Sequence, residues 1–202
     1  MKRWTLDDIS REPRWPTERT LALPGNLRGN AFRAWGLHVR SRFGHGAPDK
    51  VRAFLGLDSK SLPDVPTKKD WYPVHVQLRM MQFIIDEFLG GDARAFESVF
   101  EETSTTAEKT LVLAGRMTGP GLVLRMSGTY HESVCTVGRC TPDVGSGRAT
   151  LEFQGAEVFG DPTWRFSNMV GMQSMFTSLK RKLDLLEGED RGDSGFVIRM
   201  AW

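Results

Sequence analysis

The sequence predicts an α+β domain. N-terminal helices are expected to pack on an antiparallel sheet of about four strands, and a long helix is expected to cross the sheet before the last strand. Two observations carry this prediction. Over residues 29–100 apolar residues recur every three or four positions, as on one face of a helix, whereas from residue 110 many alternate with polar residues, as in a strand. Helices followed by strands favour a sheet with its helices on one face.

Composition narrows the class of protein. The 202 residues include 27 basic and 25 acidic side chains, and a net charge of +2 is too balanced to suggest a nucleic-acid partner. No apolar stretch approaches the ~18 residues of a membrane span, and the N-terminus has no apolar core of a secretory signal. Two cysteines allow at most one disulfide. We therefore expect a cytoplasmic protein with no membrane span and no nucleic-acid partner.

The helices are expected in the first half of the chain. Residues 1–28 contain three prolines and no sustained periodicity, so we predict an extended segment that lies over the domain and is held by Trp4 and Trp15. Residues 29–202 should then form a single α+β domain. Apolar spacings of three and four predict its first helices over residues 29–43, 48–55 and 74–88.

The strands are expected in the second half. Alternation of apolar and polar residues predicts strands over residues 110–117, 121–130, 148–158 and 196–202. A helix over about residues 163–185 connects two of them and must cross the sheet. The composition of residues 141–147 and 187–193 is typical of a loop and a solvated turn.

A metal site is the first chemical possibility to weigh. His131, Cys135 and Cys140 lie close in sequence, but a structural zinc site usually has four ligands, often in pairs spaced by two to four residues. Here four residues separate the two cysteines, and Glu132 or Asp143 would have to be the fourth ligand. We favour two ordinary half-buried thiols and a surface histidine, and expect neither a metal nor a cofactor.

Catalytic motifs are absent from the sequence. It contains no G-x-S-x-G, phosphate-binding loop, G-x-G-x-x-G or H-E-x-x-H pattern, so a non-enzymatic function is expected. A local excess of basic residues near the first two helices is more simply a solvated helix face than an anion or nucleic-acid patch. These residues are Arg28, Arg33, Arg40, Arg42, Lys50 and Arg52.

Methionine is unusually frequent on the two long helices. At helical spacing these side chains are most simply core, but thioethers also suit adaptable pockets. If an apolar ligand is bound, its pocket should lie between the helix over residues 164–185 and the sheet. The candidate lining residues are Met81, Phe88, Met169, Met172, Phe176 and Leu179.

The order of these features resembles a known layout. It consists of the Gly29-x-x-Phe32 helix ending at Arg42-Phe43-Gly44, the Trp71-Tyr72-Pro73-Val74 entry, a hydrophobic strand ending at Ser127-Gly128, and the tail ending at Trp202. The chain resembles an uncharacterised family abundant in myxobacteria. That family is similar in layout to the 4-vinyl-reductase and haem–nitric-oxide-binding superfamily, which includes vesicle-tethering subunits. The resemblance implies helices on an antiparallel sheet that bind small or apolar ligands, or partners, generally without catalysis.

The sequence departs from both cofactor-binding branches of that superfamily. The 4-vinyl-reductase branch commonly holds a metal with cysteines near the last turn, and Glu187–Gly195 contains none. The haem-binding branch needs an axial histidine and a Tyr-x-Ser-x-Arg element, which Tyr130-His131-Glu132-Ser133 does not match. The resemblance therefore implies the fold and neither cofactor.

Two functions remain open from the sequence. One is a cytoplasmic regulatory or sensory module that binds a small apolar ligand between the helix over residues 164–185 and the sheet. The alternative is a ligand-free interaction or assembly module whose partner is another protein or a second copy in a homodimer. An enclosed cavity under the long helix would favour the first, and tight packing would favour the second.

Overall fold

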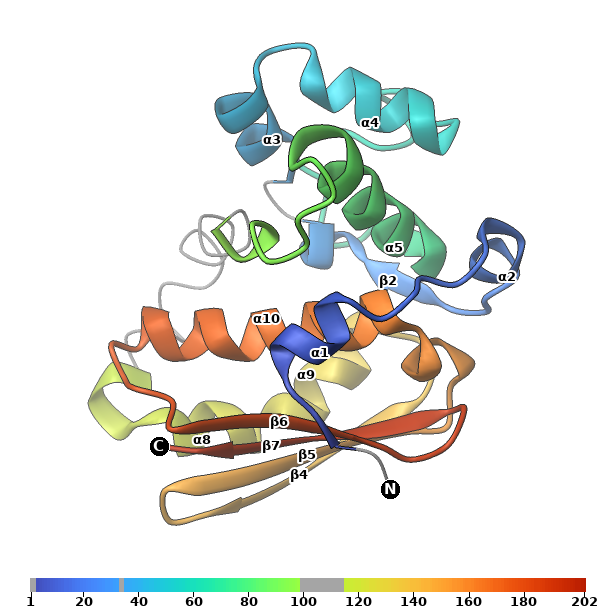
Figure 1. The fold of residues 1–202 in the computed structure, drawn as a ribbon. Helices are drawn as coiled ribbons and strands as arrows, with labels where there is room; N and C mark the ends of the chain where they lie inside the picture. Colours follow the sequence, from blue (N-terminus) through green and yellow to red (C-terminus); the bar gives the residue numbers. More distant parts are fainter. Residues whose placement is uncertain (1–2, 33–34, 99–114) are drawn as a thin grey trace.

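The computed structural model describes residues 3–32, 35–98 and 115–202. It is built in layers: α10 lies across one face of a five-stranded sheet, α5 lies beyond α10, and α3 and α4 form the outermost layer (Figure 1). The described elements, in chain order, are β1 (Arg3–Trp4), α1 (Leu6–Ser10), α2 (Thr17–Leu21), β2 (Asn26–Arg28), η1 (Gly29–Phe32), α3 (Trp35–Phe43), α4 (Ala47–Leu55), β3 (Trp71–Pro73), α5 (Val74–Phe83), the π-helical turn η2 (Ile84–Phe88), α8 (Pro120–Arg125), α9 (Ser127–Val134), β4 (Arg139–Gly145), β5 (Arg148–Gln154), η3 (Glu157–Gly160), α10 (Pro162–Ser178), β6 (Leu185–Asp190) and β7 (Gly195–Ala201).

The main sheet confirms the α+β class. Its strand order is β1-β6-β7-β5-β4, and every pairing is antiparallel. Its central pair, β5 with β7, aligns Phe153 with Phe196 and Leu151 with Ile198, and all four side chains are buried beneath the helices. The predicted strands 148–158 and 196–202 correspond to β5 and β7, although β5 ends four residues earlier than expected.

The other two predicted strands are wrong where the structure describes them. Residues 121–130 lie in α8 and α9, and residues 115–117 are helical, while residues 110–114 lie outside the described ranges. Gly119, at a φ of 86°, ends the preceding turn, and Pro120 opens α8, where its missing N–H costs nothing. Leu124 of α8 is buried. His131 and Val134 are buried too, and their spacing of three residues puts them on the same face of α9.

Two strands were predicted as loops. Residues 139–145 form β4, an edge strand that tolerates Pro142 because only one of its edges is paired in the sheet. Residues 185–190 form β6, in which Glu187 and Glu189 on the outer face alternate with Gly188 and Asp190 on the helix side. The long helix therefore ends at Ser178 rather than near residue 185, and it connects β5 to β6 rather than leading directly to the last strand.

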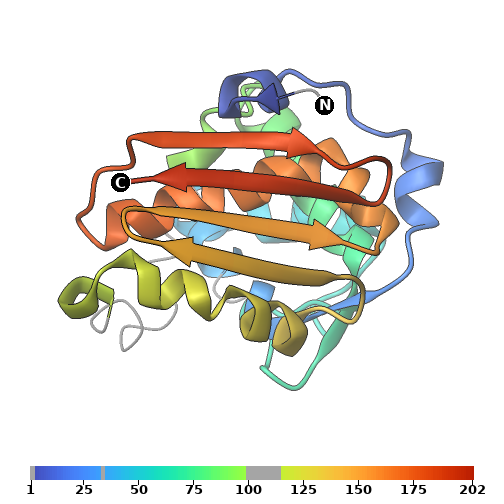
Figure 2. The ribbon, with the colours of Figure 1, turned by 90° about the horizontal axis from the view of Figure 1, so that it is seen from below.

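The outer face of the sheet carries no helix (Figure 2). Many of its side chains are charged or polar, and some of them neutralise one another: Glu189 accepts hydrogen bonds from Arg199 at 3.1 and 3.2 Å and lies 3.3 Å from Arg191. A solvated, charge-balanced face is typical of an antiparallel sheet with one buried side. The hydrophobic core is therefore confined to the helix-bearing side.

The N-terminal segment is not extended throughout, because it contains α1 and α2. Its first described residues form β1, which pairs with β6 through Arg3–Glu189 and Trp4–Gly188. The indole of Trp4 is buried, and its Nε1 donates to Asp190 at 2.8 Å. The division into a segment of residues 1–28 and a domain of residues 29–202 remains a prediction.

We expect Gly188→Ala to destabilise the protein by roughly 1–3 kcal/mol, the cost of overpacking a filled site. An added Cβ at Gly188 would lie 2.1–2.3 Å from three ring atoms of Trp4, so the indole would have to leave its slot. Urea unfolding followed by tryptophan fluorescence measures the loss. Gly121→Ala is the matched control, because its Cβ would meet only ordinary contacts at 3.6 and 4.0 Å. Equal stability of the two variants would contradict the prediction.

Within the described ranges, no helix combines the length and the hydropathy needed to cross a bilayer.

Candidate functional site

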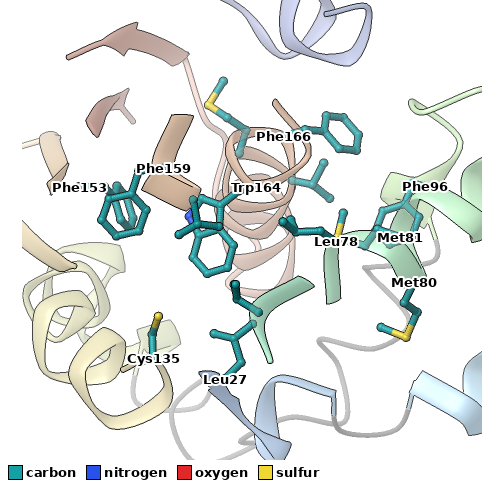
Figure 3. Packing of buried hydrophobic residues seen from close by; sticks show 14 of the residues in the cluster. Leu27, Leu78, Met80, Met81, Phe96, Cys135, Phe153, Phe159, Trp164 and Phe166 are labelled. Atoms are coloured by element: carbon teal, nitrogen blue, oxygen red, sulfur yellow. The ribbon is translucent and has the colours of Figure 1, made fainter. Parts of the chain in front are cut away.

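The predicted ligand pocket is occupied by packed side chains. Met81, Met169, Phe176 and Leu179 are buried, with Met169 and Phe176 no more than 1% exposed, while Phe88 and Met172 are half-buried. In Figure 3, Leu78 and Met81 point from α5 towards α10, whereas Met80 points to the other side of α5. The two helices therefore meet through interdigitated side chains.

The six predicted residues do not surround one space. Phe88 stacks on Phe43, with ring centroids 4.8 Å apart, and meets the edge of Phe83, so it belongs to the outer helical layer. Phe176 packs instead against Trp202 at the end of the sheet, with centroids 5.5 Å apart. The structure thus separates residues that the sequence placed together.

Two hollows lie elsewhere, and none of the six residues lines either of them. The larger has a volume of about 280 Å³ and lies where the N-terminal segment meets the β6–β7 turn; it is lined by Trp15, Arg19, Gly160, Arg165, Asp190, Gly192 and Asp193. The smaller, of about 20 Å³, lies between α1, α5 and the start of α10. The larger hollow is lined largely by charged groups, and the smaller one has room for about one water molecule.

Arg165 forms the base of the larger hollow. Its guanidinium is buried and donates to Asp190 at 2.6 Å and to the carbonyl oxygen of Gly160 at 2.5 Å. It also lies 3.6 Å from Glu12 and 5.7 Å from the ring of Trp4. Because two carboxylates neutralise its charge, Arg165 joins the N-terminal segment, α10 and β6 rather than offering a vacant anion site.

Arg19 occupies the mouth of the same hollow. Its guanidinium carbon lies 3.3 Å from the centroid of the Trp15 ring, and its Nε lies 3.4 Å from Glu157. The cation therefore already has an aromatic and an acidic neighbour. Sequence patterns could not find this hollow, because its lining combines residues 15–19 with residues 160–165 and 190–193, which lie more than 130 residues further along the chain.

His131 is buried, contrary to the surface position expected for it. Its Nε2 lies 3.1 Å from the carbonyl oxygen of Val137, and since that oxygen can only accept, Nε2 carries the proton of the neutral ring. The rings of Phe153 and Phe159 lie 6.0 and 5.7 Å away, as centroid distances. Burial lowers the pKa of His131, against the opposing effects of the Val137 carbonyl and Glu132.

We predict that acidification weakens the fold through His131. Its pKa is lowered on folding, so below the ordinary value of about 6.5 the unfolded chain binds a proton that the folded chain does not. The stabilisation from the neutral His131 ring is therefore fully present above about pH 6.5, the ordinary pKa of histidine in an unfolded chain. It is lost as the pH falls from there towards the lower pKa of His131 in the folded chain.

The measurement is the urea midpoint at pH 7.5 and 5.5. The decrease in the urea midpoint from pH 7.5 to pH 5.5 should be smaller in His131→Gln, whose amide can still donate to the carbonyl oxygen of Val137. A residual slope is expected from His75, whose pKa is also lowered, first by burial and then by Arg79. An identical slope in wild type and variant would show that His131 does not titrate differently in the folded state.

The two cysteines are buried free thiols rather than half-buried ones. Cys135 donates its S–H to the carbonyl oxygen of Val137 at 3.4 Å, and burial raises its pKa. Burial also raises the pKa of Cys140, to about 12. Both therefore stay protonated near neutral pH, and no three His, Cys, Asp or Glu side chains within the described residues are placed to hold a metal ion.

The basic residues near the first helices are mostly neutralised. Arg40 and Arg52 both form ion pairs with Asp64, and Arg52 also contacts Asp49 at 2.6 Å. These contacts tie the loop after α4 to α3 and α4. The remaining members have separate partners: Lys50 lies 3.7 Å from Glu87, Arg42 donates to Ser98, and Arg28 stacks on Trp71, while Arg33 lies outside the described residues.

Comparisons with known proteins show similarity in structure and none in sequence. No protein-family model matches the chain, and no curated protein does. A solved structure described as "Modulating Heme Redox Potential Through Protein-Induced Porphyrin Distortion" matches with a TM-score of 0.62 and 14% identity, covering 87% of this chain and all of its own.

Two further matches name their class. An oxygen-binding H-NOX domain related to soluble guanylate cyclases, in its oxygen complex, has a TM-score of 0.59 at 14% identity and covers 86% of this chain and 93% of its own. The Fe(II) unliganded H-NOX protein from K. algicida has a TM-score of 0.56 at 13% identity and covers 87% and 96%. At such low identity the likeness shows the fold alone, which is the haem–nitric-oxide-binding layout implied by the sequence.

Haem does not fit the side chains of this chain. All four histidines, both cysteines and both tyrosines fall within the described residues, and none of them lines either hollow. The buried histidine has its Nε2 committed to Val137 and its ring enclosed by phenylalanines. An axial ligand must present a free nitrogen, thiolate, thioether or phenolate to an apolar space of several hundred cubic ångströms. Neither of the two hollows offers such a ligand or such an apolar space.

Proposed function

We propose that this chain is a non-enzymatic regulatory module that acts through contacts with protein. The observation that carries this proposal is the packing between α10, α5 and the sheet, where a ligand would otherwise lie. Met169 and Phe176 are no more than 1% exposed there, and the two hollows described above lie elsewhere, one lined largely by charged groups and the other the size of about one water molecule. The likeness to H-NOX domains supports the regulatory part, since one of them is described as related to soluble guanylate cyclases.

The chemistry of the buried groups supports a non-enzymatic function. A nucleophile must be ionised or have an adjacent base, whereas the thiols of Cys135 and Cys140 have raised pKa values and His131 is held by a carbonyl oxygen. The neutralised arginines of the first helices support the absence of a nucleic-acid partner. We expect the module to work in the cytoplasm.

A second candidate is a sensor of a small apolar ligand held between α10 and the sheet. It is favoured by one observation: the chain has the fold of proteins whose descriptions name haem and bound oxygen. Side chains such as Met172 and Met175, half-buried on α10, could then move aside for a ligand, because methionine adapts its shape easily.

Native mass spectrometry of the purified chain separates the two. The proposal predicts the bare mass of the chain or a multiple of it. After incubation with one equivalent of hemin, it predicts no stoichiometric shift of the Soret band. A co-purified small molecule at one per chain would overturn the proposal in favour of the sensor. A saturable Soret shift that His131→Ala abolishes would overturn it in favour of haem. Weak, unsaturable hemin binding that survives this substitution would agree with it.

A further inference from the structure

The larger hollow, between the N-terminal segment and the β6–β7 turn, has the size of a site for one side chain. α2 and this turn lie at the same end of the molecule (Figure 1 and Figure 2). Of the lining residues, Gly160 and Arg165 are buried, while Arg19, Gly192 and Asp193 are exposed, so a partner can reach the hollow from outside. Its volume of about 280 Å³ is just below the roughly 300 Å³ at which pockets for whole small-molecule ligands begin.

The charges around this hollow favour a cation. The groups that line it or contact its charged lining are two cations and four carboxylates: Arg19, Arg165, Glu12, Glu157, Asp190 and Asp193. Asp193 makes no ion pair or side-chain hydrogen bond with any other residue that the structure describes. The nearest cation along the chain, Arg191, contacts Glu189 at 3.3 Å on the outer face of the sheet. The carboxylate of Asp193 is therefore available to a positively charged group.

The chain's own Arg19 shows which cation suits the hollow. Its guanidinium carbon lies 3.3 Å from the centroid of the Trp15 ring, so the planar cation lies over the face of the indole. Its other contact, 3.4 Å to Glu157, joins two side chains that are each about half exposed, and such pairs contribute little to stability. A second guanidinium can therefore displace Arg19 from the indole at a small cost. An ammonium lacks the flat face that lies on the ring.

We propose that the hollow receives an arginine side chain of a partner protein, which replaces Arg19 on the Trp15 ring and reaches the carboxylate of Asp193. This inference rests on the proposed function, because it gives the place and the chemistry of the contact with protein. The backbone holds the two groups side by side. A Cβ at Gly160 would lie 2.5 Å from the carbonyl oxygen of Asp193 and 3.2 Å from the Trp15 ring, so the indole and the β6–β7 turn meet over this glycine.

The experiment is an NMR titration of the full chain with Nα-acetyl-arginine amide. It follows the indole N–H of Trp15, which is identified by its absence in Trp15→Phe. A saturable shift is expected up to about 20 mM, because one side chain binds with roughly millimolar affinity. The control ligand is Nα-acetyl-citrulline amide, which has the same shape without the charge. It should bind about 10-fold more weakly, since it cannot form a charge-assisted hydrogen bond.

Two variants should change the affinity for Nα-acetyl-arginine amide in opposite directions. Asp193→Asn should weaken binding by about 5-fold, the upper range for an exposed ion pair. Arg19→Ala should strengthen it by about 2- to 5-fold, because it removes the cation that competes for the indole. Asp143→Asn, which removes an exposed carboxylate of β4, is the matched control for net charge and should leave the affinity unchanged.

Four results would overturn the inference: no saturable shift, equal binding of the arginine and citrulline amides, an unchanged affinity in Asp193→Asn, or an affinity that does not rise in Arg19→Ala. The proposed function fails on a different result, which is a small molecule that co-purifies at one per chain. A site of millimolar affinity does not retain its ligand through purification, so the two failures are distinguishable.

Discussion

Arg165→Met is expected to destabilise the protein by about 3 kcal/mol, as the loss of one member of a buried ion pair does. Methionine fills a similar volume, so packing is largely kept while the charge is removed. Asp190 then loses the donor at 2.6 Å, and the carbonyl oxygen of Gly160 loses the donor at 2.5 Å. The estimate lies at the lower end of the range for buried pairs, because Asp190 and Glu12 remain partly exposed to water.

Equilibrium unfolding in urea measures this cost. Lys182→Met is the matched control: it removes a cation whose partner at 3.0 Å, Asp184, is also exposed, and it should change stability by less than about 0.5 kcal/mol. Arg165→Lys should recover only part of the loss, since an ammonium cannot reach both oxygens in the plane of a guanidinium. An Arg165→Met variant as stable as the control would mean that Asp190 and Gly160 are satisfied without the cation.

Arg165 also shows where sequence patterns stop being informative. Its partners Glu12 and Asp190 lie on the segment after α1 and on β6, which become neighbours of α10 only when the chain folds. Helical spacing assigned residue 165 to a helix correctly, but nothing local distinguishes a buried arginine from a solvated one. The candidate hollow was missed for the same reason.

Local patterns identified the elements whose burial is one-sided. The strand β5 alternates cleanly because one face meets the helices and the other meets water. The prediction failed at β6, where the inward position 188 is a glycine filled by Trp4 from a distant segment, so its alternation is hidden. It failed at α8 and α9 because apolar residues on both faces of a helix resemble those of a buried strand.

The six ligand-site residues illustrate a different limit. Periodicity correctly indicated that Met169 and Phe176 face inward, and they are buried. Whether an inward face meets a cavity or other side chains depends on what the opposite elements contribute. Here α5 and the C-terminal Trp202 contribute the side chains that fill the space. The assignment of these residues to a ligand site stays a prediction.

Phe159→Ala is expected to cost about 3–5 kcal/mol, the range for truncating a fully buried phenylalanine. Its ring is completely enclosed, with centroid distances of 5.7 Å to Phe153, 6.0 Å to Trp164 and 6.1 Å to Phe196. Figure 3 shows Phe159 and Trp164 beside one another in the space between α9 and α10. The surrounding rings come from different elements, so they cannot all move inward to fill the gap.

The matched control is Phe54→Ala on α4, whose ring lies 4.6 Å from Phe83 but is 42% exposed, so a loss of only about 1 kcal/mol is expected. Unfolding in urea gives both values. A loss in Phe159→Ala no larger than in the control would mean that the site collapses, contrary to the arrangement of its neighbours.

Phe159→Ala also tests whether packed side chains are what prevent this fold from binding a ligand in the space around Phe159. Removing the ring leaves an apolar cavity beside His131, and apolar cavities of this kind stay dry and accept small apolar molecules. Saturating benzene should therefore raise the unfolding midpoint of Phe159→Ala and leave that of the wild type unchanged. The acid sensitivity assigned to His131 should also decrease, because a ring that is less tightly enclosed is protonated more easily. Stabilisation of the wild type by benzene would instead show that a ligand space already exists, and would favour the sensor over the interaction module.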